Sequence, residues 1–286
     1  MSRVKAGALT PMLITGSPEI ARYAFDAGVS RIFVDMEVRG KAERQGHLDT
    51  HRASHTMEDL ERVRAAAGDA EIMVRVNPLY EGTGAEVNAA LARGADRLML
   101  PMFRTRAEVE TYLGAVGGRV PVTLLAETPE AAGGASNYID LLSGRDELYV
   151  GLNDLSLALG ANFLFEPLAG GLLEEPAALA KSQNIGFGFG GIARMGERRA
   201  PLPAELILSE HVRLGSTAVI LSRAFVAGAQ SLRELRDKVD LEAEVVRLRE
   251  EETRLRGLDA AELEANREAL RQRVADIARD KAAALV

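Results

Sequence analysis

Short apolar runs, many of them rich in β-branched residues, alternate along the chain with longer stretches in which apolar residues recur at helical spacing. The runs lack strict apolar–polar alternation, as is typical of parallel strands that are covered on both faces. We therefore predict eight strands, at Met12–Thr15, Arg31–Met36, Ile72–Val76, Arg97–Pro101, Val120–Ala126, Leu148–Leu152, Ile185–Phe189 and Ala218–Ser222.

Helix signals stand between most of these strands. Ser17-Pro18-Glu19 combines a helix-capping residue, a proline suited to the first helical position and a first-turn acid. The segments 56–59 and 105–109 predict two further helix starts. Eight strands that alternate with helices predict an α/β protein with the (β/α)8 TIM barrel fold. A doubly wound open sheet is the main alternative, because counting strands does not distinguish an open sheet from a closed one.

The pattern changes after residue 230. Residues 231–286 are rich in Glu, Arg, Leu and Ala and contain no strand signal. Gly257 interrupts this segment, and Asp259 with Glu262 resembles a capping box, so we predict two long amphipathic helices. The chain then divides into a barrel domain, residues 1–230, and a helical extension, residues 231–286. The extension either packs back on the barrel or acts as an oligomerisation arm; its high charge leaves little apolar surface to bury, so we expect a homo-oligomer.

Composition narrows the class of protein. The 286 residues include no cysteine, which excludes disulfides, thiolate nucleophiles and cysteine–metal sites. The net charge of −7 argues against nucleic acid as a partner. No apolar run reaches the roughly 18 residues of a membrane span, and the N-terminus lacks the features of a secretory signal. We expect a cytoplasmic protein that acts on a small molecule and not on a membrane.

Polar side chains stand at the carboxyl ends of several predicted strands, where TIM barrels place their active sites. Asp35 and Glu37 end the second strand, and Arg75 lies in the third. Glu127 and Asp154 follow neighbouring strands, so their carboxylates are expected to converge. Two carboxylates with open positions suit a hard divalent cation such as Mg²⁺, with Mn²⁺ or Co²⁺ as alternatives.

Each of these residues also has a purely structural interpretation. Asp154 could cap the helix that follows it, and Glu127 could be a helix-start acid before Pro129. Arg75 could simply pair with one of the two acids. Their joint appearance at three strand ends favours a site.

Five segments carry a resemblance to a known family. They occur in the order and spacing of the HpcH/HpaI aldolase and citrate lyase family: Phe33–Glu37, Val74–Val76, Leu98–Met102, Ala126–Thr128 and Gly151–Ser156. The resemblance implies a metal-dependent pyruvate-type aldolase on a (β/α)8 barrel. It implies Glu127 and Asp154 as metal ligands and Arg75 as the group that meets the substrate carbonyl. The backbone amides around Asn153 and Asp154 would hold the carboxylate of a 2-oxo acid.

The chain departs from the family pattern where a general base is expected. Members similar to HpaI carry a histidine directly after the second acid of the second strand, and here Val38 takes that place. Leu125 replaces a glutamine, and the usual glycine-rich loop after the fourth strand is missing. The loop after the second strand contains His47, His51 and His55. We predict that it supplies the base, with His51 as first choice and Asp35 or Glu37 orienting the imidazole.

Other functions remain open at this stage. Lys41 and Arg44 resemble a segment of citrate lyase β and malyl-CoA lyase relatives, which would make the substrate a CoA thioester. A non-catalytic scaffold or ligand sensor is the alternative outside enzymes. The sequence Gly186–Gly191 fits the G-x-G-x-x-G pattern but comes late and inside a strand, so close approach of the backbone to a ligand, or a packed barrel seam, explains it better than a dinucleotide. No lysine stands at a strand end, so a Schiff-base aldolase has no obvious nucleophile.

Overall fold

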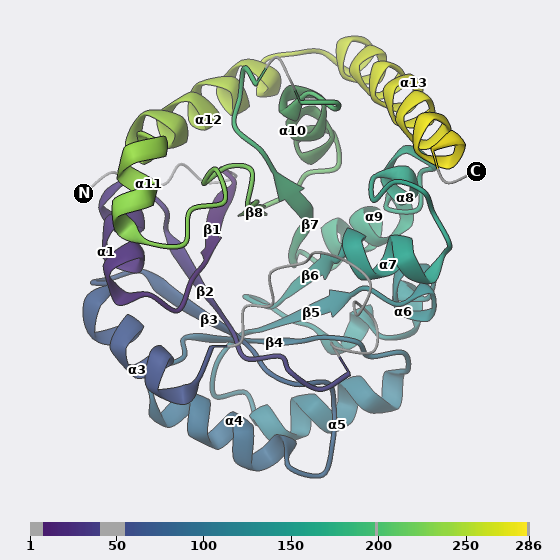
Figure 1. Cartoon of the computed structure of the whole chain (residues 1–286). Coiled ribbons are helices and arrows are strands. Elements are labelled where there is room, and N and C mark those ends of the chain that lie inside the picture. Colours follow the sequence, from purple (N-terminus) through teal and green to yellow (C-terminus); the bar gives the residue numbers. More distant parts are fainter. Residues whose placement is uncertain (1–7, 41–54, 198–199, 285–286) are drawn as a thin grey trace.

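The computed structural model describes residues 8–40, 55–197 and 200–284. Eight parallel strands form a closed barrel in the order β1 to β8, and β8 pairs with β1 (Figure 1). Closure confirms the (β/α)8 prediction and excludes the doubly wound sheet. The strands are β1 (Thr10–Ile14), β2 (Arg31–Asp35), β3 (Glu71–Arg75), β4 (Arg97–Leu100), β5 (Val122–Ala126), β6 (Glu147–Val150), β7 (Gly186–Ile192) and β8 (Ala218–Leu221).

Helices surround the barrel (Figure 1). They are α1 (Pro18–Asp26), α3 (Met57–Ala66), α4 (Thr83–Ala92), α5 (Arg106–Val116), α6 (Pro129–Gly133), α7 (Leu152–Ala158), α8 (Glu166–Ala169), α9 (Glu174–Ser182), α10 (Ala204–Arg213), α11 (Leu232–Lys238), α12 (Leu241–Arg256) and α13 (Ala260–Ala283), with 3-10 turns at Ala135–Asn137 and Ile139–Leu141. The predicted starts are confirmed. Ser17 caps α1, and Thr56 and Thr105 form capping boxes that begin α3 and α5.

Alternate residues of each strand face the barrel interior and form layers. The lowest layer, at the amino ends of the strands, is charged. Arg31 reaches across the barrel to Glu147 with two hydrogen bonds of 2.8 Å, and it also pairs with Glu71. Arg97 donates to Glu71 at 2.9 Å. Burial would raise the pKa of Glu147, but Arg31 and Arg97 outweigh it and lower the pKa. This network closes the bottom of the barrel.

The middle layer is apolar. It consists of Met12, Phe33, Met73, Met99, Leu125, Tyr149 and Ala218. Two residues further along β2 and β3 come Asp35 and Arg75, and two residues beyond Leu125 comes Glu127. The strand period of two therefore places these three polar residues in the top layer, at the carboxyl ends of the strands.

The glycines of β7 make room for Tyr149. A Cβ atom on Gly188 would lie 2.5 Å from the Tyr149 ring and 2.7 Å from the Ala218 carbonyl oxygen. The Tyr149 hydroxyl donates to the Gly190 carbonyl at 2.6 Å and accepts from the Ile220 amide at 3.1 Å. These bonds bridge a β-bulge in the β7–β8 pairing. The G-x-G-x-x-G pattern therefore lies in a packed barrel seam, one of the two interpretations of the sequence, and no helix follows it directly.

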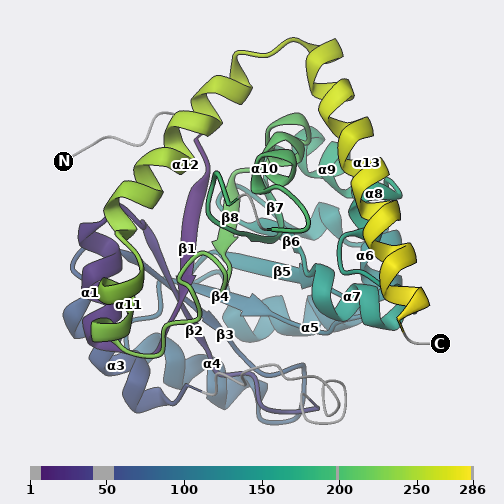
Figure 2. The ribbon, with the colours of Figure 1, turned by 45° about the horizontal axis from the view of Figure 1, so that its top comes forward.

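The C-terminal segment is helical, as predicted, with a short α11 before the two long helices. α12 lies between α10 and α1 and completes the ring of helices, and α13 packs against α10 and α8 from the outside (Figures 1 and 2). The side chains that they bury are Leu241, Val245, Leu248, Glu252, Leu255, Leu270, Val274 and Ile277. Glu252 accepts the Leu9 amide at 2.8 Å, just before β1. The expectation that this segment lacks apolar surface to bury on its own barrel is therefore wrong.

Among the described residues, no helix combines the length and the apolar character that crossing a bilayer requires.

Candidate active site

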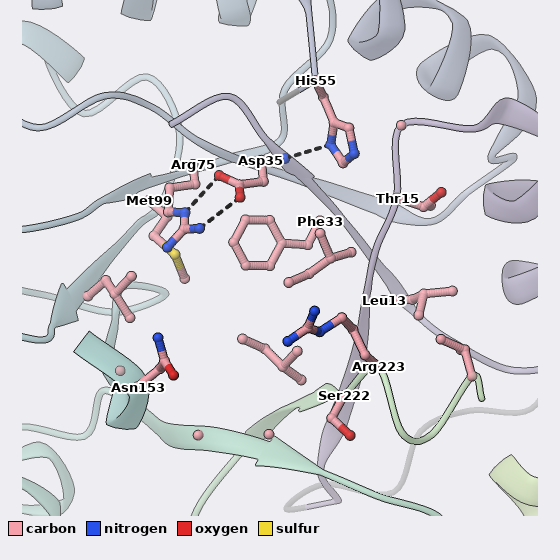
Figure 3. A pocket seen from close by; sticks show the side chains of 18 of the residues that line it. Leu13, Thr15, Phe33, Asp35, His55, Arg75, Met99, Asn153, Ser222 and Arg223 are labelled. Carbon is pink, nitrogen blue, oxygen red and sulfur yellow. Dashed lines mark hydrogen bonds and ion pairs between the residues drawn. The ribbon is translucent and has the colours of Figure 1, made fainter. Parts of the chain in front are cut away.

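A cavity of about 750 Å³ opens at the carboxyl ends of the strands (Figure 3). Of the predicted site residues, Asp35, Arg75, Glu127, Asn153 and Asp154 line it. They come from β2, β3 and the segments after β5 and β6, which are far apart in sequence. The barrel therefore brings together most of the residues that the sequence analysis selected.

Arg75 is held in the cavity wall by two acids. Asp35 is its register partner on β2, and the Arg75 Nε and Nη2 atoms donate to the two Asp35 oxygens at 2.9 and 2.8 Å. Glu37 lies behind, with Oε2 3.3 Å from Arg75 Nη1, and is only 1% exposed. Burial lowers the pKa of Arg75, but the charges of Asp35, Glu37 and Glu127 outweigh it and raise the pKa, so the guanidinium stays charged. Arg75 thus pairs with the two acids of β2 and its end, and the charge of Glu127 also acts on it.

Glu127 follows β5 directly and is 3% exposed. The cap of α6 is Thr128, so the interpretation of Glu127 as a helix-start acid is wrong. Its Oε1 atom accepts the Met102 amide at 3.2 Å. Met102 has φ of 56°, a left-handed conformation that is strained for a residue with a side chain and that turns its N–H toward the acid. The loop after β4, which lacks the family's glycines, therefore positions Glu127.

Asp154 is 8% exposed and lies in the first turn of α7. The cap of α7 is Gly151, so Asp154 is not the helix cap, because the helix starts earlier than the sequence indicated. A Cβ atom on Gly151 would lie 2.9 Å from Glu127 Oε2. The glycine thus lets Glu127 pack against the start of α7, three residues before Asp154. Asn153, the preceding residue, is exposed and lines the cavity (Figure 3).

These two buried acids fit a divalent cation. Glu127 and Asp154 line the same cavity and approach one helix start, held there by the Met102 amide and the absent side chain of Gly151. Within residues 8–40, 55–197 and 200–284, no group of three or more histidine, cysteine or acidic residues is arranged to hold a metal. A two-carboxylate site matches Mg²⁺, which takes few protein ligands and keeps positions for water and substrate oxygens.

Comparison with known proteins identifies the family. The family model described as HpcH/HpaI aldolase/citrate lyase matches residues 13–162, which are 150 of the 286 residues. The chain belongs to this family. No curated protein sequence matches it significantly.

Solved structures of the HpcH/HpaI type share the fold. An HpcH/HpaI aldolase from Desulfitobacterium hafniense DCB-2 is 15% identical, with a TM-score of 0.58 over 89% of this chain and 95% of that one. A family protein from Burkholderia cenocepacia J2315 is 19% identical, with a TM-score of 0.57 over 81% and 96%. Citrate synthase SbnG is 16% identical, with a TM-score of 0.57 over 81% and 94%. At these identities the likeness concerns the fold alone.

The histidine loop is only partly described. His47 and His51 lie outside the described residues. His55 precedes the Thr56 cap and lines the cavity. Its Nδ1 atom accepts the Asp35 amide at 2.9 Å (Figure 3), so the neutral ring carries its proton on Nε2. Val38, at the HpcH/HpaI family's histidine position, is 55% exposed and does not line the cavity.

The site contains residues to which the sequence analysis gave no role. Tyr149 lines the cavity, and its buried hydroxyl fixes the β7 bulge above it. Ser222 and Arg223, at the end of β8, form part of the opposite wall (Figure 3). Leu235 of α11 also contributes, so the C-terminal extension helps to close the cavity. The polar end of the eighth strand was the available signal for Arg223.

Proposed function

We propose that this protein is a divalent-metal-dependent carbon–carbon lyase, an aldolase that acts through the enolate of a pyruvate-like 2-oxo acid. The observation that supports it most is the convergence of two buried acids and an ion-paired arginine on one cavity at the carboxyl ends of the strands. Membership of the HpcH/HpaI aldolase/citrate lyase family supports lyase activity. The finer assignment depends on the roles of the individual residues.

Glu127 and Asp154 would hold the cation, with Mg²⁺ proposed and Mn²⁺ or Co²⁺ as alternatives. When bound, such a cation supplies a Lewis acid that polarises the carbonyl of the 2-oxo acid and stabilises the negative charge of its enolate. Both acids are nearly buried, so a cation between them would be bound at low solvent screening.

Arg75 would donate to the carbonyl oxygen, which becomes the enolate oxygen. Asp35 and Glu37 position it from behind, so the guanidinium meets the substrate in one fixed orientation. The first-turn amides of Asn153 and Asp154 have no acceptor within α7 by helix geometry, which fits them for the substrate carboxylate. The roles of Asp35 and Glu37 are therefore positioning roles.

The reaction requires a proton acceptor and a proton donor. In condensation, the methyl group loses a proton, its carbon bonds to the aldehyde carbon, and the resulting alkoxide takes a proton; cleavage reverses these steps. In cleavage, the acceptor takes the proton of the hydroxyl group, and for this role we retain the prediction of His51. His55 accepts at Nδ1, so it suits the donor role in that direction, the return of a proton to the enolate carbon, through Nε2.

Replacing His47, His51 and His55 one at a time by glutamine tests the loop. If His51 is the base, the His51 variant should lose aldol cleavage at least about 100-fold while it still binds pyruvate, because a general base contributes about this much. Cleavage rates and pyruvate binding are measured for each variant. Normal cleavage in all three would exclude the loop and leave Glu37 as the side-chain candidate.

Deuterium exchange into the methyl group of pyruvate tests the proposed function directly, because it needs only enolate formation. We expect exchange with Mg²⁺, its loss in EDTA, and its loss in Glu127→Gln and Asp154→Asn variants that keep the wild-type circular dichroism. Glu130→Gln, an exposed acid on α6, is the matched control and should exchange normally. Full exchange in EDTA would refute the metal-dependent mechanism, and no exchange under any metal would support the non-catalytic alternative.

The alternative of a CoA thioester substrate rests on residues that lie outside the described part of the chain. Lys41 and Arg44, which suggested it, are both in the segment 41–54. The described residues add nothing that favours CoA, so the aldolase is the function proposed.

A further inference from the structure

The second acid behind Arg75, Glu37, lies past the end of its strand. Asp35 is the last residue of β2, and the pairing of β2 with β3 ends with Asp35 and Arg75. The Glu37 amide donates to Asp35 Oδ1 at 3.2 Å, and the Glu37 carboxylate lies 3.3 Å from Arg75 Nη1. Because the strand pairing stops before Glu37, its place behind the guanidinium depends on what holds the segment that follows.

Asn77 holds the two residues that come after Glu37. It lies two residues after Arg75, past the end of β3, and is 8% exposed. Its Oδ1 atom accepts the backbone amides of both Val38 and Arg39, each at 3.0 Å. A carbonyl oxygen has two lone pairs, so one atom satisfies both donors. The peptide units that follow Glu37 are thus tied to the end of the strand that carries Arg75.

Glu86, in the first turn of α4, orients the side chain of Asn77. Its Oε1 atom accepts Asn77 Nδ2 at 2.8 Å and the Asn77 backbone amide at 3.2 Å. A carboxylate accepts hydrogen bonds and does not donate them, so Glu86 draws the NH2 group toward α4 and leaves the carbonyl oxygen for the segment after β2. Neither Asn77 nor Glu86 lines the cavity. Their effect on a substrate therefore passes through other residues.

We propose that Asn77, oriented by Glu86, is a positioning residue for Arg75, because it keeps Glu37 behind the guanidinium. The inference rests on the proposed aldolase function, in which Arg75 donates to the enolate oxygen. If Glu37 moves, the guanidinium keeps its bonds to Asp35 but loses the contact at Nη1. A displacement of about 1 Å at a group that meets the reacting atoms costs about 100-fold in rate.

Asn77→Ala removes the acceptor of the two backbone amides. We expect kcat for pyruvate methyl exchange to fall at least about tenfold. KM should change by less than about twofold, because the displaced donor acts on the enolate oxygen and hence in the transition state. Asn88→Ala is the matched control: Asn88 lies on α4, is exposed and bonds to Arg119, so it should exchange normally. A kcat within about twofold of wild type for Asn77→Ala would overturn the proposal.

An exchange of the two groups tests the orientation and covers the case that Asn77→Ala does not fold. Asn77→Asp sets a second carboxylate against Glu86 and should also lower kcat at least about tenfold. The double variant Asn77→Asp/Glu86→Gln has an acid and an amide again, with their places reversed, so the bond between them re-forms. Its kcat should return to within about threefold of wild type. A double variant as slow as Asn77→Asp would overturn the role of Glu86.

A double-mutant cycle tests whether the effect passes through Arg75. Once Arg75→Lys has removed the planar fork, adding Asn77→Ala should lower kcat by less than about threefold more, because two residues that act through one contact are not additive. An undiminished tenfold loss in the Arg75→Lys background would show that Asn77 acts elsewhere.

A measurement without catalysis separates this proposal from the aldolase itself. Arg75 Nε donates to Asp35, and its N–H signal in NMR, assigned by its loss in Arg75→Lys, reports how firmly the guanidinium is held. In metal-free protein without pyruvate, Asn77→Ala should speed the exchange of this hydrogen with water at least about tenfold. If wild type catalyses no methyl exchange but this acceleration is seen, the aldolase proposal fails and the positioning of Arg75 stands. If methyl exchange is normal and the N–H exchange is unchanged, only the positioning is overturned.

Discussion

At the scale of single residues, the chemistry depends on how firmly Arg75 is held. Two parallel hydrogen bonds to Asp35, at 2.9 and 2.8 Å, fix both the position and the plane of its guanidinium. A lysine in its place would keep the charge but not the fork. The Arg75 side chain is 13% exposed, so little water could replace a hydrogen bond to Asp35 that a lysine did not make.

Arg75→Lys should therefore lower kcat for pyruvate methyl exchange by about 100-fold, the usual cost of a lost oxyanion donor. The exchange is followed by NMR at saturating pyruvate. Arg106→Lys, an exposed α5 position with ion pairs at the surface, serves as the control for the substitution itself and should be neutral. A nearly normal rate in Arg75→Lys would mean that Arg75 serves only to neutralise its acidic neighbours.

The sequence predicted the top-layer residues because the end of a strand is a local feature, and a (β/α)8 barrel places its site at the carboxyl ends of the strands. Arg75 stands at the end of its strand and Glu127 directly after its strand, which placed both at the mouth. The hydrogen-bond partners of these residues could not be predicted in the same way. The pairing of Arg75 with Asp35 requires the β2–β3 register, and the contact of His55 with Asp35 requires the path of a loop. Neither follows from spacing along the chain.

At the scale of elements, the β7 glycines show how one aromatic ring shapes a wall of the site. Tyr149 fills the barrel beside β7, and only a residue without a side chain fits at Gly188. Its hydroxyl then ties the bulge of β7 to the Ile220 amide on β8. Burial raises the pKa of Tyr149, which keeps the hydroxyl protonated as a donor. The sequence showed a glycine pattern here, but the ring that explains it belongs to a neighbouring strand.

Gly188→Ala should destabilise the protein by about 1–3 kcal/mol, because the new methyl group would meet the Tyr149 ring at 2.5 Å and the Ala218 carbonyl at 2.7 Å. Urea unfolding followed by circular dichroism measures the change. Gly114→Ala is the matched control: Gly114 lies within α5 with nothing near its Cβ position, so alanine should stabilise the protein by about 0.5–1 kcal/mol. Equal changes in the free energy of unfolding for the two substitutions would show that the barrel seam accommodates a methyl group at Gly188.

At the scale of the whole molecule, the C-terminal helices are part of the barrel's packing. α12 and α13 bury Leu248 and Leu270 completely, and the buried Glu252 bonds to the segment that begins β1. The composition of residues 231–286 did not reveal this packing, because the segment is highly charged. A helix needs apolar side chains on only one face in order to pack. The homo-oligomer stays a prediction, but it no longer follows from a lack of apolar surface to bury on the barrel.

His211 links the stability of the whole molecule to pH. It lies within α10, does not line the cavity, and is fully buried. Its ring stacks on Phe189 with centroids 3.8 Å apart, and neither ring nitrogen has a partner among the described residues. Burial lowers the pKa of His211 to about 3 from the ordinary 6.5, because the charged form would lack both water and hydrogen bonds.

The depressed pKa of His211 makes the fold sensitive to acid. Below pH 6.5 His211 is protonated in the unfolded chain, whereas in the folded protein it stays neutral down to about pH 3. The stability from this residue is therefore complete above pH 6.5 and is lost as the pH falls through that window, by about 1.4 kcal/mol per pH unit. His211→Leu keeps an apolar group of similar size against Phe189. Between pH 6.5 and pH 5 its free energy of unfolding should fall by about 2 kcal/mol less than that of wild type. Urea unfolding at pH 8, 6.5 and 5 measures both proteins. The carboxylates that titrate in this range are common to both, so parallel stability profiles would mean that His211 is protonated equally in the folded and unfolded states.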